Sequence, residues 1–244
     1  MLSVLTITYQ RSGMLEEAIM SYISQDYIGE SEMVVLNDSP LVEYQFTQYP
    51  YPSTPYEAWF RGAGSGYMKQ IRIINHPTRF PNIGRKLEYG YKACKGDFVY
   101  RLDDDDALHP TALTQVQSWI DKNPAYDVYR ASHFYQIENN QFTKISESIN
   151  TGNVLSREYI NRLTFPDKNA DEDLDIVFSP GVKMFTAPNT KTMLYRWRGD
   201  GTHISNHINK PNEERLNFMP TNEHGIIVLK PHFDHDYYSQ LPHE

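Results

Sequence analysis

The stretch DFVYRLDDDDALHP, residues 97–110, ends an apolar run with four consecutive aspartates, Asp103 to Asp106. Its first half is short, apolar and rich in β-forming residues, which predicts a buried strand. Adjacent carboxylates repel one another, and each raises the pKa of its neighbour. A strand that ends in such a run therefore calls for a bound cation or for open solvent around the turn.

Metal binding is the first interpretation of the four aspartates. Carboxylate oxygens are the ligands that Mg²⁺, Mn²⁺ and Ca²⁺ prefer, and open α/β sheets place ligand sites at the carboxyl ends of their strands. Alternate residues of an extended segment face the same way, so we expect Asp103 and Asp105 on one side and Asp104 and Asp106 on the other. The alternative is a solvated acidic turn that caps the helix beginning near His109.

Outward from this stretch, the pattern predicts alternating strands and helices. Strands are expected at 2–8, 31–40, 71–77, 97–102, 126–137, 141–148 and 192–197. Helices are expected at 14–25, 82–96, 110–124, and near 156–163 and 171–179. A β–loop–α–β opening implies parallel strands joined by a right-handed crossover, so the fold class is α/β with a Rossmann-like, mostly parallel sheet flanked by helices.

Two regions lack a clear period. Residues 41–70 are rich in tyrosine, proline and glycine and are expected to form a long loop, with a short helix near 56–60. The last forty residues are expected to form an irregular wrap. We therefore expect one domain over 1–244, with a core over 1–110, an elaborated half over 111–206 and a wrap over 207–244.

Composition narrows the function classes. The 244 residues are 39% hydrophobic, which is enough for a large core, and the net charge of −8 argues against general affinity for nucleic acid. The single cysteine, Cys94, fits a reducing compartment. No signal peptide and no apolar run long enough to span a membrane is evident, so a cytoplasmic protein is expected.

Other charged residues have both a functional and an ordinary interpretation. Asp38 could accept a ring N–H of a bound base, or it could cap its own turn. Glu172 and Asp173 could supply a general base, or they could serve the dipole at a helix start. Arg85 and Lys86 open a helix against its dipole, so they indicate a nearby phosphate or acidic loop, or plain surface charge. His203, in a glycine-containing turn, is a metal ligand or a structural histidine.

Taken in order, these motifs resemble glycosyltransferase family 2, which has the GT-A fold. The ITYQRSG segment resembles its Thr-Tyr-Asn-Arg turn, with Gln10 in the usual asparagine position. NDSP resembles its Asp-Gly-Ser turn, and NIGRKLEYGYKACKGDFVYRLDDDD resembles its Asn-x-Gly helix, Ala-x-Gly-Asp turn and Asp-x-Asp motif. Glu172-Asp173 matches the family's Glu-Asp. The resemblance runs from residue 2 to about residue 206.

The resemblance implies a role for each matched position. It places a nucleotide-diphosphate sugar, by default a UDP-sugar, in the half over 1–110 and an acceptor in the half over 111–206. The residues implied to bind the donor are Thr8, Tyr9, Arg11, Asp38, Lys86, Asp103 and Asp104. The implied ligands of Mn²⁺ or Mg²⁺ are Asp105, Asp103 and His203, with a register uncertain by one residue. Asp173 is implied as the catalytic base, next to Glu172.

The implied activity is a metal-dependent, inverting transfer of a sugar to an acceptor hydroxyl, since one base and one metal ion suit a single displacement. A peripheral membrane association stays open. The alternatives are a nucleotidyltransferase on a related fold and a catalytically inactive sugar- or nucleotide-binding protein. A metal-dependent nuclease is disfavoured by the acidic net charge.

Overall fold

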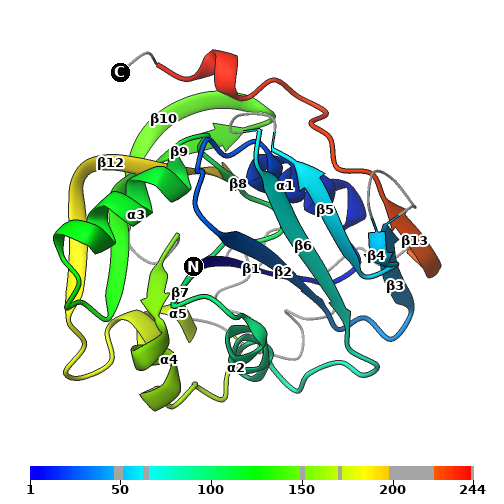
Figure 1. The fold of residues 1–244 in the computed structure, drawn as a ribbon, viewed down its shortest axis with the longest axis horizontal. Coiled ribbons are helices and arrows are strands. Elements are labelled where there is room, and N and C mark those ends of the chain that lie inside the picture. Colours follow the sequence, from blue (N-terminus) through cyan, green and yellow to red (C-terminus); the bar gives the residue numbers. More distant parts are fainter. Residues whose placement is uncertain (47–51, 63–65, 149–151, 170–171, 198–222, 243–244) are drawn as a thin grey trace.

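The computed structural model describes residues 1–46, 52–62, 66–148, 152–169, 172–197 and 223–242 (Figure 1). The helices are α1 (Ser12–Ile23), α2 (Ile83–Ala93), α3 (Ala112–Lys122), α4 (Arg157–Arg162) and α5 (Glu172–Val177), with a 3-10 turn η2 (Tyr238–Gln240). The first strands are β1 (Leu2–Thr8), β2 (Ser31–Asn37), β3 (Val42–Phe46), β4 (Pro52–Thr54), β5 (Glu57–Arg61), β6 (Met68–Asn75) and β7 (Phe98–Arg101). The remaining strands are β8 (Ala107–Leu108), β9 (Val128–Glu138), β10 (Gln141–Glu147), β11 (Val154–Ser156), β12 (Met184–Trp197) and β13 (Gly225–Leu229).

A parallel core, β6-β2-β1-β7, forms the centre of an eleven-stranded sheet. On one side β5 and β4 extend it in antiparallel fashion, and on the other β11 joins β7 to β9, with β12 and β8 beyond. β10 pairs with β9 as an antiparallel hairpin. The expected Rossmann-like, mostly parallel α/β fold is confirmed.

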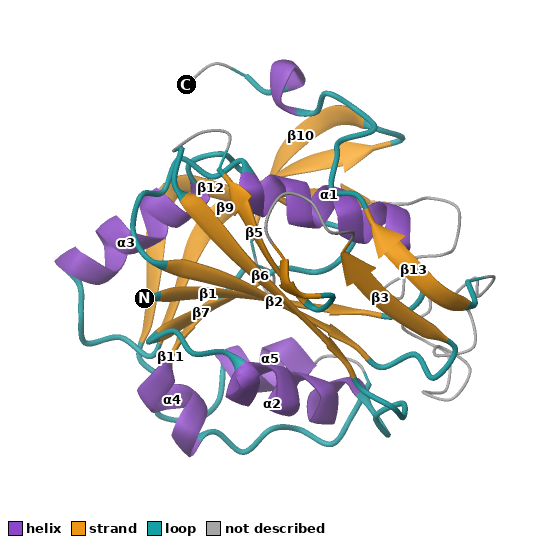
Figure 2. Cartoon of the chain, turned by 45° about the vertical axis from the view of Figure 1, so that its right-hand side comes forward, coloured by secondary structure: helices purple, strands orange, loops and turns teal. Residues whose placement is uncertain are grey.

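Helices cover both faces of this sheet, as Figure 2 shows. Successive side chains of a strand point to opposite faces. Val4 accordingly packs in the cluster that contains α1 and α3, while its neighbour Leu5 packs in the cluster that contains α2, α4 and α5. Burial on both faces explains why β1 and β2 read as continuous apolar runs. Among the described residues, no helix is both long and apolar enough to cross a membrane.

The expectation for 41–70 is wrong. In place of a loop with a short helix, the chain forms β3, β4 and β5, and β6 already begins at Met68. Glu57–Arg61 is a strand because it pairs with β6, which buries Ala58 and sets Phe60 edge-on against Phe46 at 5.4 Å. Aromatic residues favour such half-buried strands.

The expectation of an irregular C-terminal wrap is also wrong in part. Residues 223–242, here called the C-terminal strap, begin with β13, which pairs in parallel with β3 (Figure 1). The strap then runs along α1, where the Lys230 amide donates to Glu16 Oε1, and ends in η2 beside the β9–β10 hairpin. The helix expected at 82–96 ends at Ala93, three residues before Gly96.

Candidate active site

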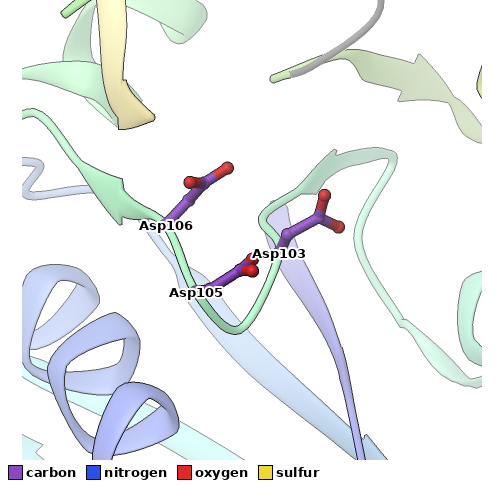
Figure 3. A group of neighbouring side chains, drawn as sticks. All are labelled: Asp103, Asp105 and Asp106. Atoms are coloured by element: carbon purple, nitrogen blue, oxygen red, sulfur yellow. The ribbon is translucent and has the colours of Figure 1, made fainter. Parts of the chain in front are cut away.

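The acidic run forms a tight turn between β7 and β8. The Asp106 amide donates to the Asp103 carbonyl at 3.1 Å, which closes a four-residue turn and reverses the chain. The expected alternation of Asp103 and Asp105 against Asp104 and Asp106 is therefore wrong, because the run is not extended. Asp103, Asp105 and Asp106 instead each offer an oxygen, all within 4.8 Å of one another, as Figure 3 shows. We call the four residues Asp103 to Asp106 the acidic turn.

Asp104 is the member of the acidic turn that is not part of this group. Its carboxylate is 1% exposed and lies 2.7 Å from Arg11 Nη2. Burial raises the pKa of Asp104 to about 6, with Arg11 acting in the opposite direction. Asp104, which the sequence predicted to bind the donor, is therefore a side chain enclosed by the protein.

Arg11 joins the end of β1 to the acidic turn. Its guanidinium contacts Asp104 and also donates to Asp105 Oδ2 at 2.8 Å. Burial alone would lower the pKa of Arg11, but the neighbouring carboxylates hold it above its ordinary value. Arg11 is thus a permanent cation that fixes two of the four aspartates.

Arg101 joins the acidic turn to α5. Its Nε donates to Asp103 Oδ1 at 3.0 Å, and its Nη1 lies 3.4 Å from Glu172 Oε1 and contacts Asp173 Oδ1. Burial acts to lower the pKa of Arg101, and the carboxylates of Asp103 and Glu172 keep it above its ordinary value. One guanidinium therefore brings together motifs that lie about seventy residues apart in the sequence.

The two carboxylates of α5 differ in access. The Asp173 side chain is 22% exposed, whereas that of Glu172 is 8% exposed. Only Asp173 of this pair is open enough to meet an incoming hydroxyl group, while Glu172 packs against Arg101. Asp173 is thus the more accessible carboxylate of the predicted pair.

The loop before α5 is held by the N-terminus of α2. Asn169 Oδ1 accepts from the Ile83 amide at 2.9 Å, and the Lys168 carbonyl accepts from the Gly84 amide at 3.1 Å. A Cβ atom at Gly84 would lie 1.8 Å from the Pro166 carbonyl oxygen. Gly84 is therefore required for the close approach that places α5.

Asp38 and Lys86 form a buried ion pair behind the strand ends. Lys86 Nζ donates to Asp38 Oδ1 at 2.5 Å and to the Thr8 carbonyl at 2.7 Å. The Phe80 amide donates to Asp38 Oδ2 at 3.0 Å. Burial lowers the pKa of Lys86, and Asp38 opposes this shift. Of the alternatives left open for Lys86, a phosphate, an acidic loop or plain surface charge, the structure shows an acidic partner, Asp38, and both oxygens of Asp38 accept internal hydrogen bonds.

The turn after β1 carries the remaining predicted donor residues. Tyr9 is partly buried, and the Arg79 guanidinium lies 4.3 Å above its ring. Gln10 has a φ of 54° and donates through Nε2 to Ser39 Oγ at 2.8 Å. Asparagine adopts positive φ more readily than glutamine does, which explains why asparagine is usual in this position of the motif.

The residues of the acidic turn fit a hard divalent cation. All three grouped side chains offer carboxylate oxygens, the donor type that Mg²⁺ and Mn²⁺ prefer. Within the described part of the chain, Asp106 Oδ2 is buried and has no hydrogen-bond partner. A buried carboxylate oxygen without a partner is costly, and a cation would satisfy it. The predicted ligand His203 lies outside the described residues.

Sequence reasoning missed three basic residues of this region. Arg79 covers Tyr9, Arg101 joins the acidic turn to α5, and Arg196 of β12 donates from its backbone to Asp106. The sequence could have indicated Arg101, because it lies at the end of a predicted strand, next to the acidic run. Arg196 had no such signal, because its contact depends on the order of strands in the sheet.

The sequence matches the family model described as glycosyl transferase family 2 over residues 57–187, more than half of the chain. The matched segment contains Lys86, the acidic turn and the carboxylates of α5. No curated protein matches the sequence.

Solved structures share the fold. S. aureus TarS 1-349 has a TM-score of 0.57 at 13% identity, over 89% of this chain and 69% of that one. The complex of TarS 1-349 with UDP-GlcNAc has a TM-score of 0.57 at 14% sequence identity, over 81% of this chain and 58% of that one. Mannosyltransferase PcManGT from Pyrobaculum calidifontis, in complex with GDP-Man and Mn²⁺, has a TM-score of 0.51 at 14% sequence identity, over 80% of this chain and 56% of that one.

This chain spans 36% of another S. aureus TarS chain, so it corresponds to a part of that longer protein. The match to the family model does not depend on those structures. It covers the segment that contains β7, the acidic turn and α5. The chain belongs to glycosyl transferase family 2.

Proposed function

We propose that this glycosyltransferase moves a sugar from a nucleotide-diphosphate donor to an acceptor hydroxyl, with inversion and with the help of a divalent metal ion. The observation that carries the proposal is the junction at Arg101. This side chain joins the three-carboxylate group of the acidic turn to Asp173, a partly exposed carboxylate on a separate element. A metal-binding group beside a single accessible base is the arrangement that a one-step displacement needs.

The acidic turn would hold the metal ion. Asp105, Asp103 and Asp106 supply the oxygens, so Asp106 joins the two ligands predicted from the sequence. A bound Mn²⁺ or Mg²⁺ supplies Lewis-acid stabilisation of the negative charge on the diphosphate leaving group. Arg11 holds Asp105 in place by a hydrogen bond to its carboxylate. A contact from His203 to the diphosphate or the metal stays part of the proposal.

Asp173 would act as the general base. It takes the proton of the acceptor hydroxyl as the oxygen attacks the anomeric carbon, on the face opposite the leaving group. The contact with Arg101 orients the carboxylate, and Glu172 shares the same guanidinium. With one base and no second nucleophile in the proposal, the product anomer is inverted.

The turn after β1 would bind the nucleotide. Tyr9 offers a partly exposed ring under Arg79, and Arg11 offers positive charge. Thr8, Asp38 and Lys86 would shape the pocket from behind through their hydrogen bonds. TarS in complex with UDP-GlcNAc and PcManGT in complex with GDP-Man support a nucleotide-diphosphate sugar as donor, and we propose a UDP-sugar. The division into a donor half (1–110), an acceptor half (111–206) and a C-terminal wrap (207–244) belongs to the same proposal.

A donor-hydrolysis panel tests the function. The protein is incubated with UDP-glucose, UDP-galactose, UDP-N-acetylglucosamine and GDP-mannose, each with Mn²⁺, with Mg²⁺ or with EDTA, and released nucleotide is quantified. We expect release from a UDP-sugar that requires the metal and stops with EDTA. The anomer formed in the transfer reaction, read by NMR, tests inversion. Equal release with and without metal, or binding of none of these donors by calorimetry in the presence of Mn²⁺, would contradict the proposal.

A further inference from the structure

Arg196, near the end of β12, is a second arginine that contacts the acidic turn. Its backbone amide donates to Asp106 Oδ1 at 2.9 Å, and its Nε donates to the carbonyl oxygen of Asp105. The residue is 8% exposed. These contacts act on one carboxylate oxygen and on the backbone of the turn, and they leave Asp106 Oδ2 without a hydrogen-bond partner among the described residues. Arg196 thus fixes the shape of the turn without covering that oxygen.

The charge of Arg196 is balanced by Glu17 of α1. Arg196 Nη1 contacts Glu17 Oε2, and Glu17 is 3% exposed. A buried carboxylate and guanidinium are costly to desolvate, and such a pair persists where further hydrogen bonds satisfy both groups. Because α1 and β12 come from distant parts of the sequence, the pair ties the acidic turn to two elements that do not belong to it.

The C-terminal strap completes this network. The Asp234 amide donates to Glu17 Oε1 at 3.0 Å, and the Tyr237 hydroxyl donates to Glu17 Oε2 at 3.1 Å. The Tyr238 hydroxyl donates to the Leu108 carbonyl at 2.7 Å, two residues beyond the turn. The contacts therefore form a chain: the strap contacts Glu17, Glu17 contacts Arg196, and Arg196 contacts the acidic turn.

We propose that Glu17 and Arg196, held by Tyr237 of the strap, are positioning residues that set the metal affinity of the acidic turn. The proposal rests on the proposed function, in which this turn binds Mn²⁺ or Mg²⁺. Three carboxylates bind a cation well only when their oxygens are held at the required spacing before the cation arrives. Residues behind the ligands supply that spacing, and their loss commonly weakens metal binding by about 10- to 100-fold.

The test measures the binding of Mn²⁺ alone to the full chain by calorimetry, and then the dependence of donor hydrolysis on Mn²⁺ concentration. The variants are Arg196→Gln, Arg196→Lys and Tyr237→Phe. Tyr237→Phe removes one hydroxyl and keeps the ring, so it retains the packing of the strap. The matched controls are Arg72→Gln and Tyr129→Phe. Arg72 forms a partly buried ion pair with Glu32 elsewhere in the sheet, and the Tyr129 hydroxyl donates to the Asn123 carbonyl.

We expect Arg196→Gln to weaken Mn²⁺ binding about 10- to 100-fold and Tyr237→Phe to weaken it a few-fold. Arg196→Lys, which keeps the positive charge, should weaken it much less than Arg196→Gln does. At saturating Mn²⁺ the kcat of Tyr237→Phe should match that of the wild type, because its defect lies in metal affinity. The control variants should lose thermal stability without any change in Mn²⁺ affinity.

Three results would overturn the proposal. If Arg196→Gln and Tyr237→Phe bind Mn²⁺ as tightly as the wild type, the proposal fails and the proposed function stands. A loss of affinity no larger than that of the control variants would equally refute the positioning role. If the wild-type protein itself binds no Mn²⁺, both the metal-dependent function and this inference fail.

Discussion

Arg101 contacts Asp173 through its guanidinium, so the last residue of β7 is joined directly to the helix that carries the proposed base. The same guanidinium donates to Asp103 in the acidic turn. A shift of the Asp103 or the Asp173 carboxylate would therefore displace the guanidinium that also contacts the other. This contact joins the acidic turn and α5 into one connected site.

Asp173→Asn should lower transfer by about 10²- to 10⁴-fold, because it removes the base but keeps the shape of the side chain. Donor binding, measured by calorimetry with UDP and Mn²⁺, should change little. Asp175→Asn is the matched control, since Asp175 is on the same helix, is exposed, and pairs with Lys168. Full activity of Asp173→Asn, or an equal loss in the control, would show that another residue is the base.

Asp106→Asn should raise the melting temperature in metal-free buffer and abolish tight Mn²⁺ binding. Burial, with added repulsion from Asp105 and Asp103, raises the pKa of Asp106 well above its ordinary value, so its ionised form destabilises the metal-free fold. Removing that charge relieves the cost and removes a ligand. Asp121→Asn, on the exposed face of α3, is the control and should change neither quantity. A fall in the metal-free melting temperature of Asp106→Asn would contradict this account.

Gly84→Ala should destabilise the protein by about 1–3 kcal/mol, because the added Cβ would collide with the Pro166 carbonyl. The collision pushes on the loop before α5, so kcat should fall together with stability. Gly13→Ala is the matched control, since a Cβ there meets nothing within 4 Å. That change should stabilise α1 by about 0.5–1 kcal/mol. Chemical denaturation of both variants checks the pair, and equal effects would refute the steric argument.

Cys94 should be inert to thiol reagents in the native state at pH 8. It is 4% exposed, and burial, aided by the carboxylate of Glu32, raises the pKa of its thiol from 9.0 to about 12. The unfolded chain releases this proton near pH 9 while the folded chain retains it, so stability falls as the pH rises from about 9 to about 12. Denaturant titrations at pH 8 and 10.5 should show a smaller loss for Cys94→Ala than for the wild type. Rapid labelling of the native protein would contradict the prediction.

Much of the core was predictable because its signals are local. Residues 2–8 are a continuous apolar run, and the helices expected at 82–96 and 110–124 have strong apolar periodicity. The structure confirms the strand and both helices, with the helices at Ile83–Ala93 and Ala112–Lys122. The strand β5 was missed because its strand character comes from pairing with β6, and a five-residue aromatic segment does not reveal its partner. The same limit applied to β13, whose partner β3 lies near the other end of the chain.

The site followed the same rule. The grouping of Asp103, Asp105 and Asp106 was mispredicted because alternation assumes an extended backbone, while one hydrogen bond from Asp106 to Asp103 turns the chain back. Asp38 and Lys86 were singled out from sequence as separate candidates, yet their contact depends on the packing of α2 against β1 and β2. Residues could thus be nominated one at a time, but their partners required the fold.

The pairing of β13 with β3 has a consequence for the order in which the protein is built. Val42 is synthesised early, whereas its partner Gly225 lies 183 residues further along the chain (225 − 42) and is synthesised much later. Closing so large a loop is slow and costs chain entropy. Glu223, next to β13, also accepts from the Ser12 amide and from Tyr44, whose hydroxyl in turn accepts from the Arg11 amide. A nascent chain can therefore form its parallel core before residue 223 is made, whereas the turn around Arg11 gains its contacts with Glu223 only after that residue has been synthesised.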